Sequence, residues 1–180
     1  MRHGCFATEI PGFTQLEEEM MNITRIGVMV LAVVFWNAAN AQDSQKLIGL
    51  WKLVSYELEF QDTGERQTPF GAHPNGYGVI TAEGRTMAVL TAEGRAIPKS
   101  DEDRAAAFKT VVAYTGMLKV EGDHWTTHVD VTWNEAWNGT DQVRFFRLDG
   151  DTLHISSAWS TNLNYEGRLT RGVLKWERVH

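Results

Sequence analysis

The sequence predicts an all-β protein, an eight-stranded antiparallel barrel with one inserted helix. Apolar and polar residues alternate with a period of two through most of residues 51–179, which is typical of strands with one buried face. Glycine-containing turns separate the alternating runs at short intervals, as in sandwiches and barrels. Eight strands are enough for a closed barrel to enclose one small ligand, and closure leaves no exposed sheet edge.

Each expected strand ends at a turn signal. The turn Ala82-Glu83-Gly84-Arg85 offers a glycine for positive φ, and Gly122 and Gly150 mark two later turns. The eight expected strands are Trp51–Phe60, Tyr77–Thr81, Thr86–Thr91, Thr115–Glu121, His124–Trp133, Gln142–Leu148, Thr152–Trp159 and Arg168–Val179.

A single segment carries a helix signal. In Ser100-Asp-Glu-Asp103 the serine hydroxyl can accept from a free backbone N–H, and the acidic residues suit a helix N-terminus. Ala105, Phe108 and Val112 then fall on one face. The pattern predicts a helix over about 101–113.

The N-terminal part, residues 1–41, is interpreted as an extension followed by a signal peptide. The apolar run Ile26–Trp36 follows Arg25 and precedes Ala39-Asn40-Ala41, which predicts a secretory signal cleaved after Ala41. The run is shorter than the roughly 20 residues of a membrane span, so we expect no stable span after cleavage. The alternative is a buried helix or a retained anchor.

The start of translation is a related hypothesis. Glu17-Glu18-Glu19 places acid where a signal peptide is basic, so Met20 or Met21 is a better start than Met1. Residues 42–180 would form the exported domain, periplasmic or secreted. The chain has 43% hydrophobic residues and a formal charge of −6, which favours a globular domain and argues against nucleic acid as a partner.

Several stretches occur in an order that resembles the lipocalin-like domain family of bacteria and fungi, within the calycin group. They span residues 47–180: Leu47–Tyr56, Pro69–Tyr77, Phe108 with Tyr114 and Gly116, Gly122-Asp123 with His128, Gly139–Arg144, Leu148–Leu153 and Trp176–Arg178. The resemblance implies a barrel whose cavity takes small apolar molecules. A loop that usually carries a proline reads Asn134-Glu-Ala-Trp137 here.

The same resemblance implies how one end of the barrel closes. Gly49 and Trp51 open the first strand, and Arg178 ends the last, so the guanidinium is expected to stack over the indole ring. Such a contact is worth roughly 0.5–2 kcal/mol. These three residues are therefore interpreted as architecture rather than as a binding site.

Aromatic residues are the first candidates for ligand contacts. Trp133, Trp137 and Trp159 lie near strand ends, where they line either a cavity mouth or the core. Tyr77, at the end of one family-like stretch, is a further candidate. Trp51 and Trp176 fit the core better.

The role of two polar candidates depends on which face of their strand points into the barrel. His128 and Asp130 share one face of their strand, with Trp125, Val129 and Val131 on the other. Inside the barrel, His128 could orient a ligand or act as a base with Asp130; outside, both are solvated surface residues.

Arg144 is the third polar candidate, on one face of its strand with Gln142 and Phe146. An inward arginine would need a carboxylate from Asp130, Glu57 or an acidic ligand. The alternative is an arginine on the strand surface.

Other chemistry finds little support in the sequence. His73, His124, His128 and His154 lack zinc-site spacing, and neither a phosphate-binding loop nor a Gly-x-Ser-x-Gly elbow occurs, so no metal or cofactor is expected. The leading hypothesis is an exported barrel that binds a small hydrophobic ligand. The alternatives are a cofactor-independent isomerase, cyclase or hydrolase using His128 and Asp130, and an interaction module with a filled barrel. The oligomeric state stays open.

Overall fold

The computed structural model describes residues 45–180. The expected signal peptide, its cleavage site and the alternative start codons lie outside these residues. Within the described part of the chain, no helix has the length and apolar character needed to cross a membrane.

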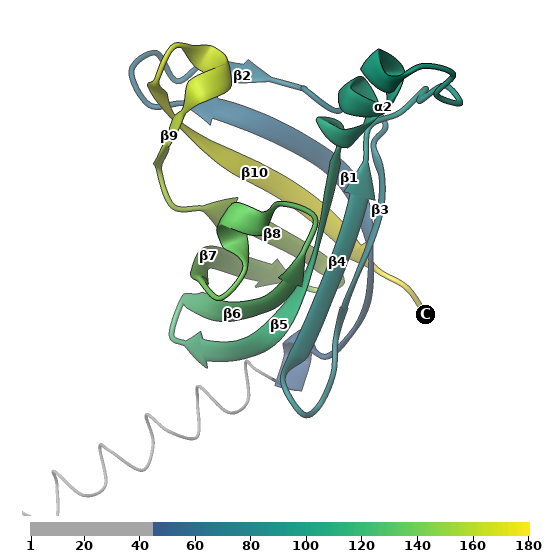
Figure 1. The fold of residues 1–180 in the computed structure, drawn as a ribbon. Coiled ribbons are helices and arrows are strands. Elements are labelled where there is room, and N and C mark those ends of the chain that lie inside the picture. The colour runs from purple at the N-terminus through teal and green to yellow at the C-terminus, as the bar shows by residue number, and fades with distance from the viewer. Residues whose placement is uncertain (1–44) are drawn as a thin grey trace, which may run out of the picture. The chain divides into compact units, whose positions relative to one another are not determined.

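The described residues form one antiparallel sheet with few helices (Figure 1). The strands are β1 (Gly49–Phe60), β2 (Arg66–Gln67), β3 (Asn75–Ile80), β4 (Arg85–Thr91), β5 (Val111–Glu121), β6 (His124–Thr132), β7 (Asp141–Asp149), β8 (Thr152–Ser157), β9 (Ser160–Asn162) and β10 (Arg168–Arg178). The helices are α2 (Asp101–Phe108) and the 3-10 turns η1 (Glu135–Trp137) and η2 (Leu163–Tyr165).

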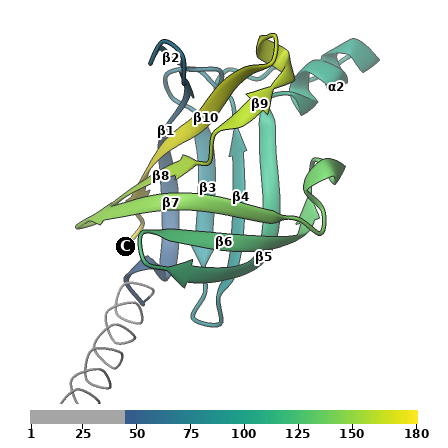
Figure 2. The same cartoon turned by 90° about the vertical axis from the view of Figure 1, so that its left-hand side faces the viewer.

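Eight of these strands close into a barrel, as the sequence predicted. The order is β1-β3-β4-β5-β6-β7-β8-β10, and β10 returns to pair with β1 from Trp51↔Arg178 to Phe60↔Thr170. Figure 2 shows β5 to β8 crossing in front of β1, β3 and β4, so the sheet folds over on itself. Strands β2 and β9 were not predicted from the sequence, because two or three residues are too few to show a period.

Helix α2 begins as expected and ends earlier. Ser100 caps it, accepting from the Asp103 N–H, while the Asp103 carboxylate accepts in return from the Ser100 N–H at 3.2 Å. The expected end at 113 was wrong, because Val111 and Val112 pair with Thr91 and Leu90 of β4. β-Branched valines suit this strand, which forms part of the barrel wall. The helix itself buries no residue.

The closed end of the barrel has the predicted contact. The Arg178 guanidinium lies 4.2 Å from the centroid of the Trp51 ring and donates to the carbonyl oxygens of Ile48, at 2.8 Å, and Lys46. Gly49 has φ of +144°, and a Cβ there would lie 2.7 Å from Nη1 of Arg178. Glycine at this position therefore leaves room for the guanidinium.

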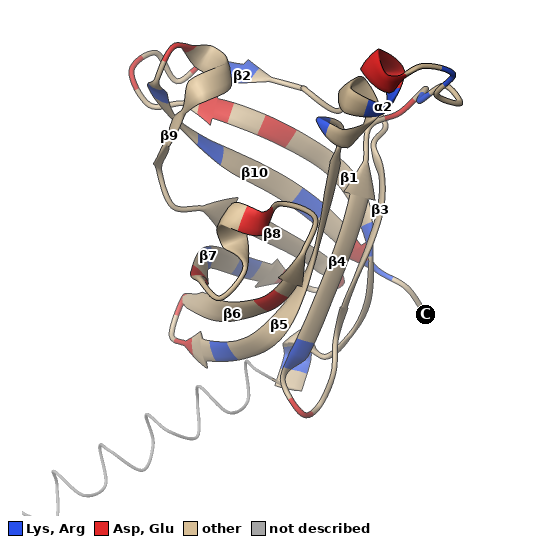
Figure 3. Ribbon diagram, viewed as in Figure 1, with Lys and Arg blue, Asp and Glu red and all other residues tan. Residues whose placement is uncertain are grey.

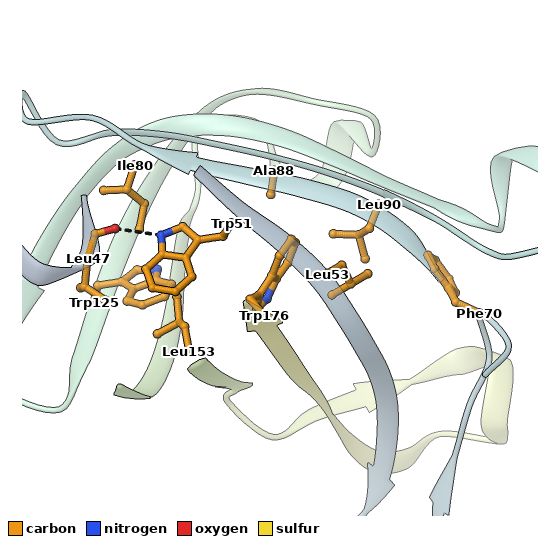
Figure 4. Packing of buried hydrophobic residues seen from close by; sticks show 10 residues of the cluster. All are labelled: Leu47, Trp51, Leu53, Phe70, Ile80, Ala88, Leu90, Trp125, Leu153 and Trp176. Carbon is orange, nitrogen blue, oxygen red and sulfur yellow. Dashed lines mark hydrogen bonds between the residues drawn. The ribbon is translucent and has the colours of Figure 1, made fainter. Parts of the chain in front are cut away.

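The core fills this end of the barrel (Figure 4). Trp51 is 2% exposed and donates from Nε1 to the Leu47 carbonyl oxygen at 2.9 Å. Trp125, Leu153 and Trp176 complete the surroundings of its ring. The expectation that Trp51 and Trp176 belong to the core is confirmed.

Two bulges decide which side chains point inward. On β1 the register shifts between Leu53 and Ser55, so Tyr56, Leu58 and Phe60 follow Trp51 and Leu53 onto the inner face. A strict period of two from Trp51 would have placed Ser55 and Glu57 inside.

The second bulge lies in β6, where Thr115 pairs with Val131 but Gly116 pairs with Val129. It places Val131 outside, 64% exposed, although the sequence grouped Val131 with the buried Trp125 and Val129. Gly116 allows the close approach, since a Cβ at this position would collide with the His128 carbonyl oxygen. An extra residue on one strand is the usual cause of such a change of face.

Candidate functional site

A cavity of about 540 Å³ lies inside the barrel. It reaches from Trp51 at the closed end to Ala158, which follows β8, and Ser160, the first residue of β9. Strands β2 and β9 lie with α2 at the opposite end of the barrel from the Trp51–Arg178 contact (Figure 1). The volume falls within the range of roughly 300–1,000 Å³ that is typical of small-molecule sites.

The cavity wall is mostly apolar and comes from every long strand of the barrel. Aromatic rings and branched aliphatic side chains provide most of it: Trp51, Leu58, Ile80, Leu90, Val112, Tyr114, Trp125, Leu153, Ile155, Leu174 and Trp176. Among them, Trp176 is buried and its Nε1 has no hydrogen-bond partner in the described part of the chain. An apolar wall of this kind gains free energy when it covers apolar ligand surface, about 25 cal/mol per Å².

Tyr56 is a cavity residue that the sequence analysis missed. Its ring packs edge-on against Phe70 at 4.9 Å and lies over Gly172, where a Cβ would be 3.2 Å from the ring. Burial raises the pKa of its hydroxyl; Tyr165 adds to this rise, and the positive charge of Arg144 opposes it. The alternation with Leu58 and Phe60 is the sequence signal that could have placed Tyr56 inside.

Arg144 lies on the inner face of β7. It pairs with the buried Trp125 of β6 and with Ser157 of β8, and both of these residues line the cavity. Residues that pair across antiparallel strands share a face, so the half-buried Arg144 side chain projects into the cavity. Its Nη1 donates to the Val143 carbonyl oxygen at 2.8 Å.

Trp137 lies beside Arg144 in the cavity wall. Its ring centroid is 5.5 Å from the Arg144 guanidinium carbon, 5.8 Å from the Tyr114 ring and 4.9 Å from the Trp133 ring. The loop around η1, where the resemblance led us to expect a proline, is held by hydrogen bonds. Asn134 caps η1 by accepting from the Ala136 N–H at 3.2 Å.

The other aromatic candidates lie outside the cavity lining. Trp133 packs edge-on against the Trp137 ring. The Trp159 ring centroid is 4.6 Å from the guanidinium carbon of Arg171. Tyr77 is 52% exposed on the outer surface of β3. The structure therefore brings Arg144 and Trp137 together at the cavity and separates Trp133, Trp159 and Tyr77 from it.

His128 and Asp130 both lie on the outer surface. The His128 Nδ1 is 2.8 Å from Oδ1 of Asp141, and the Asp130 carboxylate pairs with Arg85. Arg85 holds the pKa of Asp130 below its ordinary value, mainly through this hydrogen bond. Neither residue lines the cavity, and the two are not partners of each other.

Arg171 and Asp141 also border the cavity, but both are paired. On β10 the buried Thr170 and the inward Gly172 flank Arg171, which directs its side chain outward to the Glu59 carboxylate at 2.8 Å. This hydrogen bond lowers the pKa of Glu59. Figure 3 shows the same neighbourhood, with acidic positions of β1 beside basic positions of β10.

A metal site is absent from residues 45–180, where no three His, Cys, Asp or Glu side chains converge. The wall offers hydroxyl, amide and guanidinium groups, the kinds of group that can hydrogen-bond to a ligand. Arg144 is the charged side chain that the described strands direct into this space.

A closed antiparallel barrel with an apolar internal cavity defines a class of small-molecule-binding barrels. The family model described as a lipocalin-like domain matches residues 48–179, and the chain belongs to that family. No curated protein matches the chain. The solved structure of an uncharacterised protein from Bacteroides eggerthii DSM 20697 shares 14% identity over 74% of this chain and 99% of that one, with a TM-score of 0.37.

Proposed function

We propose that this protein is exported and binds a small hydrophobic molecule in its barrel cavity. The observation that carries the proposal is the cavity of about 540 Å³, walled by indole rings and branched aliphatic side chains. A barrel that served only as an interaction module would have a filled interior. The apolar segment at 26–36 with its small residues at 39–41 supports export.

An enzyme on the same barrel would need a base other than His128. Neither His128 nor Asp130 lines the cavity; both lie on the outer surface, where His128 pairs with Asp141 and Asp130 pairs with Arg85. Ligand binding is therefore the function that the geometry supports best.

The direct test is native mass spectrometry of the protein purified from its own host. We expect a co-purified small molecule, and we expect lipids or aromatic compounds to quench tryptophan fluorescence, because Trp51, Trp125 and Trp176 line the cavity. Absence of a bound molecule together with no quenching across the panel would contradict the proposal.

A substitution at the rim separates cavity binding from surface binding. Ala158 is exposed and lines the cavity, so Ala158→Trp is expected to narrow the entrance and weaken binding at least tenfold with little effect on folding. Ala105→Trp, on the exposed surface of α2, is the matched control because it adds the same fluorophore away from the cavity. Equal affinities of the two variants would show that ligands bind elsewhere.

Export is tested separately. N-terminal sequencing of the protein recovered from the host envelope or medium should begin at Gln42, and recovery from the cytoplasm with the upstream residues intact would contradict export.

A further inference from the structure

The charge of Arg144 has no carboxylate partner among the described residues. The protein carboxylates that the sequence offered are engaged elsewhere: Asp130 with Arg85, and Glu57 with Arg66 at 2.9 Å. The bulge in β1 turns Glu57 outward, which removes it from the cavity. Of the three sources of a carboxylate considered for Arg144, only an acidic ligand remains.

The guanidinium also has unused hydrogen-bond donors. It carries five N–H groups, and the Val143 carbonyl oxygen is its one acceptor within residues 45–180. Trp137 covers it at 5.5 Å, which reduces its access to water. A half-buried cation in an apolar cavity is costly unless an anion or water satisfies it, so the site favours an anionic guest.

A second donor lines the same cavity as Arg144. The Tyr56 hydroxyl forms no hydrogen bond within the described residues, and Tyr56 lines the same cavity. Arg144 and Tyr56 both line this cavity, so the guanidinium and the phenol border the same space. A group that accepts from Arg144 thus has a neutral O–H donor in the same space.

We propose that the ligand is an amphiphile with a single carboxylate group, which Arg144 binds inside the cavity with Tyr56 as a second donor. This inference rests on the proposed function. One arginine balances one negative charge, and its planar fork matches a carboxylate bidentately. A dianionic phosphate would leave one charge unbalanced among indole and aliphatic side chains. The apolar part of the ligand fills the rest of the cavity.

Isothermal titration with matched acid and neutral probes tests the head group. The probes are dodecanoic acid with dodecanol and dodecyl phosphate, and 2-naphthoic acid with its methyl ester, all at pH 7.5. We expect the wild-type protein to bind the acid of at least one set roughly ten- to a hundredfold more tightly than its neutral analogue, as for a hydrogen-bonded charge pair. For the dodecyl set, we also expect the phosphate to bind more weakly than the acid.

The variant Arg144→Gln should lose the preference for the acid and bind the neutral probe within about threefold of wild type. Arg144→Lys keeps the charge without the planar fork, so its preference for the acid should be intermediate between those of wild type and Arg144→Gln. The matched control is Arg147→Gln, which removes an exposed charge from the outer side of the same strand and should keep the preference. Retained affinity for the neutral probe also shows that each variant is folded.

The outcomes separate the two proposals. Equal binding of acid and neutral probes by the wild type, or a preference that survives in Arg144→Gln, overturns the carboxylate site and leaves cavity binding intact. A preference for the phosphate overturns the assignment of a single negative charge. No binding of any probe, together with an empty protein from the native host, overturns both.

Discussion

Replacing Arg178 by alanine is predicted to destabilise the barrel by about 3 kcal/mol while leaving ligand binding nearly unchanged. The substitution removes the contact with the Trp51 ring at 4.2 Å, worth about 1 kcal/mol at this exposure. It also removes the hydrogen bonds to Ile48 and Lys46 and the pair with Asp151 at 3.2 Å. Partly exposed interactions of this kind contribute about 0.5–1 kcal/mol each.

Urea denaturation of the purified variants measures the effect. The urea curves give the free energy of unfolding directly. On heating, a loss of about 3 kcal/mol should lower the melting temperature by about 10 °C in a domain of this size. Arg147→Ala is the control: Arg147 is exposed and should change the free energy of unfolding by less than about 0.5 kcal/mol. If Arg178→Ala falls within that same margin, the argument that this contact closes the barrel is refuted.

Gly49 supplies a second, independent check through a double-mutant cycle. Gly49→Ala should destabilise the protein for two reasons, the φ of +144° and the collision of its Cβ with Arg178. In the Arg178→Ala background the collision disappears and the backbone strain stays, so the same substitution should cost less. Additive free energies would mean that Gly49 is required for its backbone conformation alone.

Three further predictions concern the wall of the barrel. Thr127 is fully buried with no partner for its hydroxyl among the described residues, so Thr127→Val should raise the free energy of unfolding by about 1 kcal/mol in urea denaturation; a destabilised variant would indicate a bridging water. Gly116→Ala should prevent soluble folding or cost more than about 3 kcal/mol, because its Cβ would collide with the His128 carbonyl oxygen; a melting temperature close to wild type would rule out the close approach. Arg171 lowers the pKa of Glu59 from its ordinary 4.5, so this pair stabilises the fold above that pH and loses its contribution as the pH falls through the lowered value. The stability difference between wild type and Arg171→Met should therefore shrink between pH 5 and 3, and a constant difference would contradict the pairing.

The sequence was sufficient for the parts of the fold that depend on local chemistry. Period-two alternation and glycine turns predicted the eight barrel strands, and Ser100 predicted the start of α2. The family resemblance predicted that Arg178 covers Trp51. The end of α2 was missed because the pairing of Val111 and Val112 with β4 is a tertiary interaction.

The residues of the candidate site were predicted only in part. Alternation with a period of two separates the two faces of a strand but does not tell which face points inward. Arg144 and Trp137 line the cavity, whereas His128 and Asp130 face solvent. The sequence named no residue of β1 as a ligand contact, although Tyr56 is one of the polar groups in the wall. A shift of one residue exchanges the two faces of a strand, and the amino-acid pattern does not encode where that shift occurs.

The sequence by itself determined the class of fold, the strands that form it and the contact that closes it, because these depend on turn residues and on alternation within each strand. Only the tertiary structure decided which side chains share the cavity. Two bulges, at Leu53/Ser55 in β1 and at Asp130 in β6, set the faces of their strands, and the pairing of Arg144 with Trp125 places one unpaired cation inside. Register between strands far apart in sequence is a property of the closed sheet, so the site emerges only when the barrel has closed.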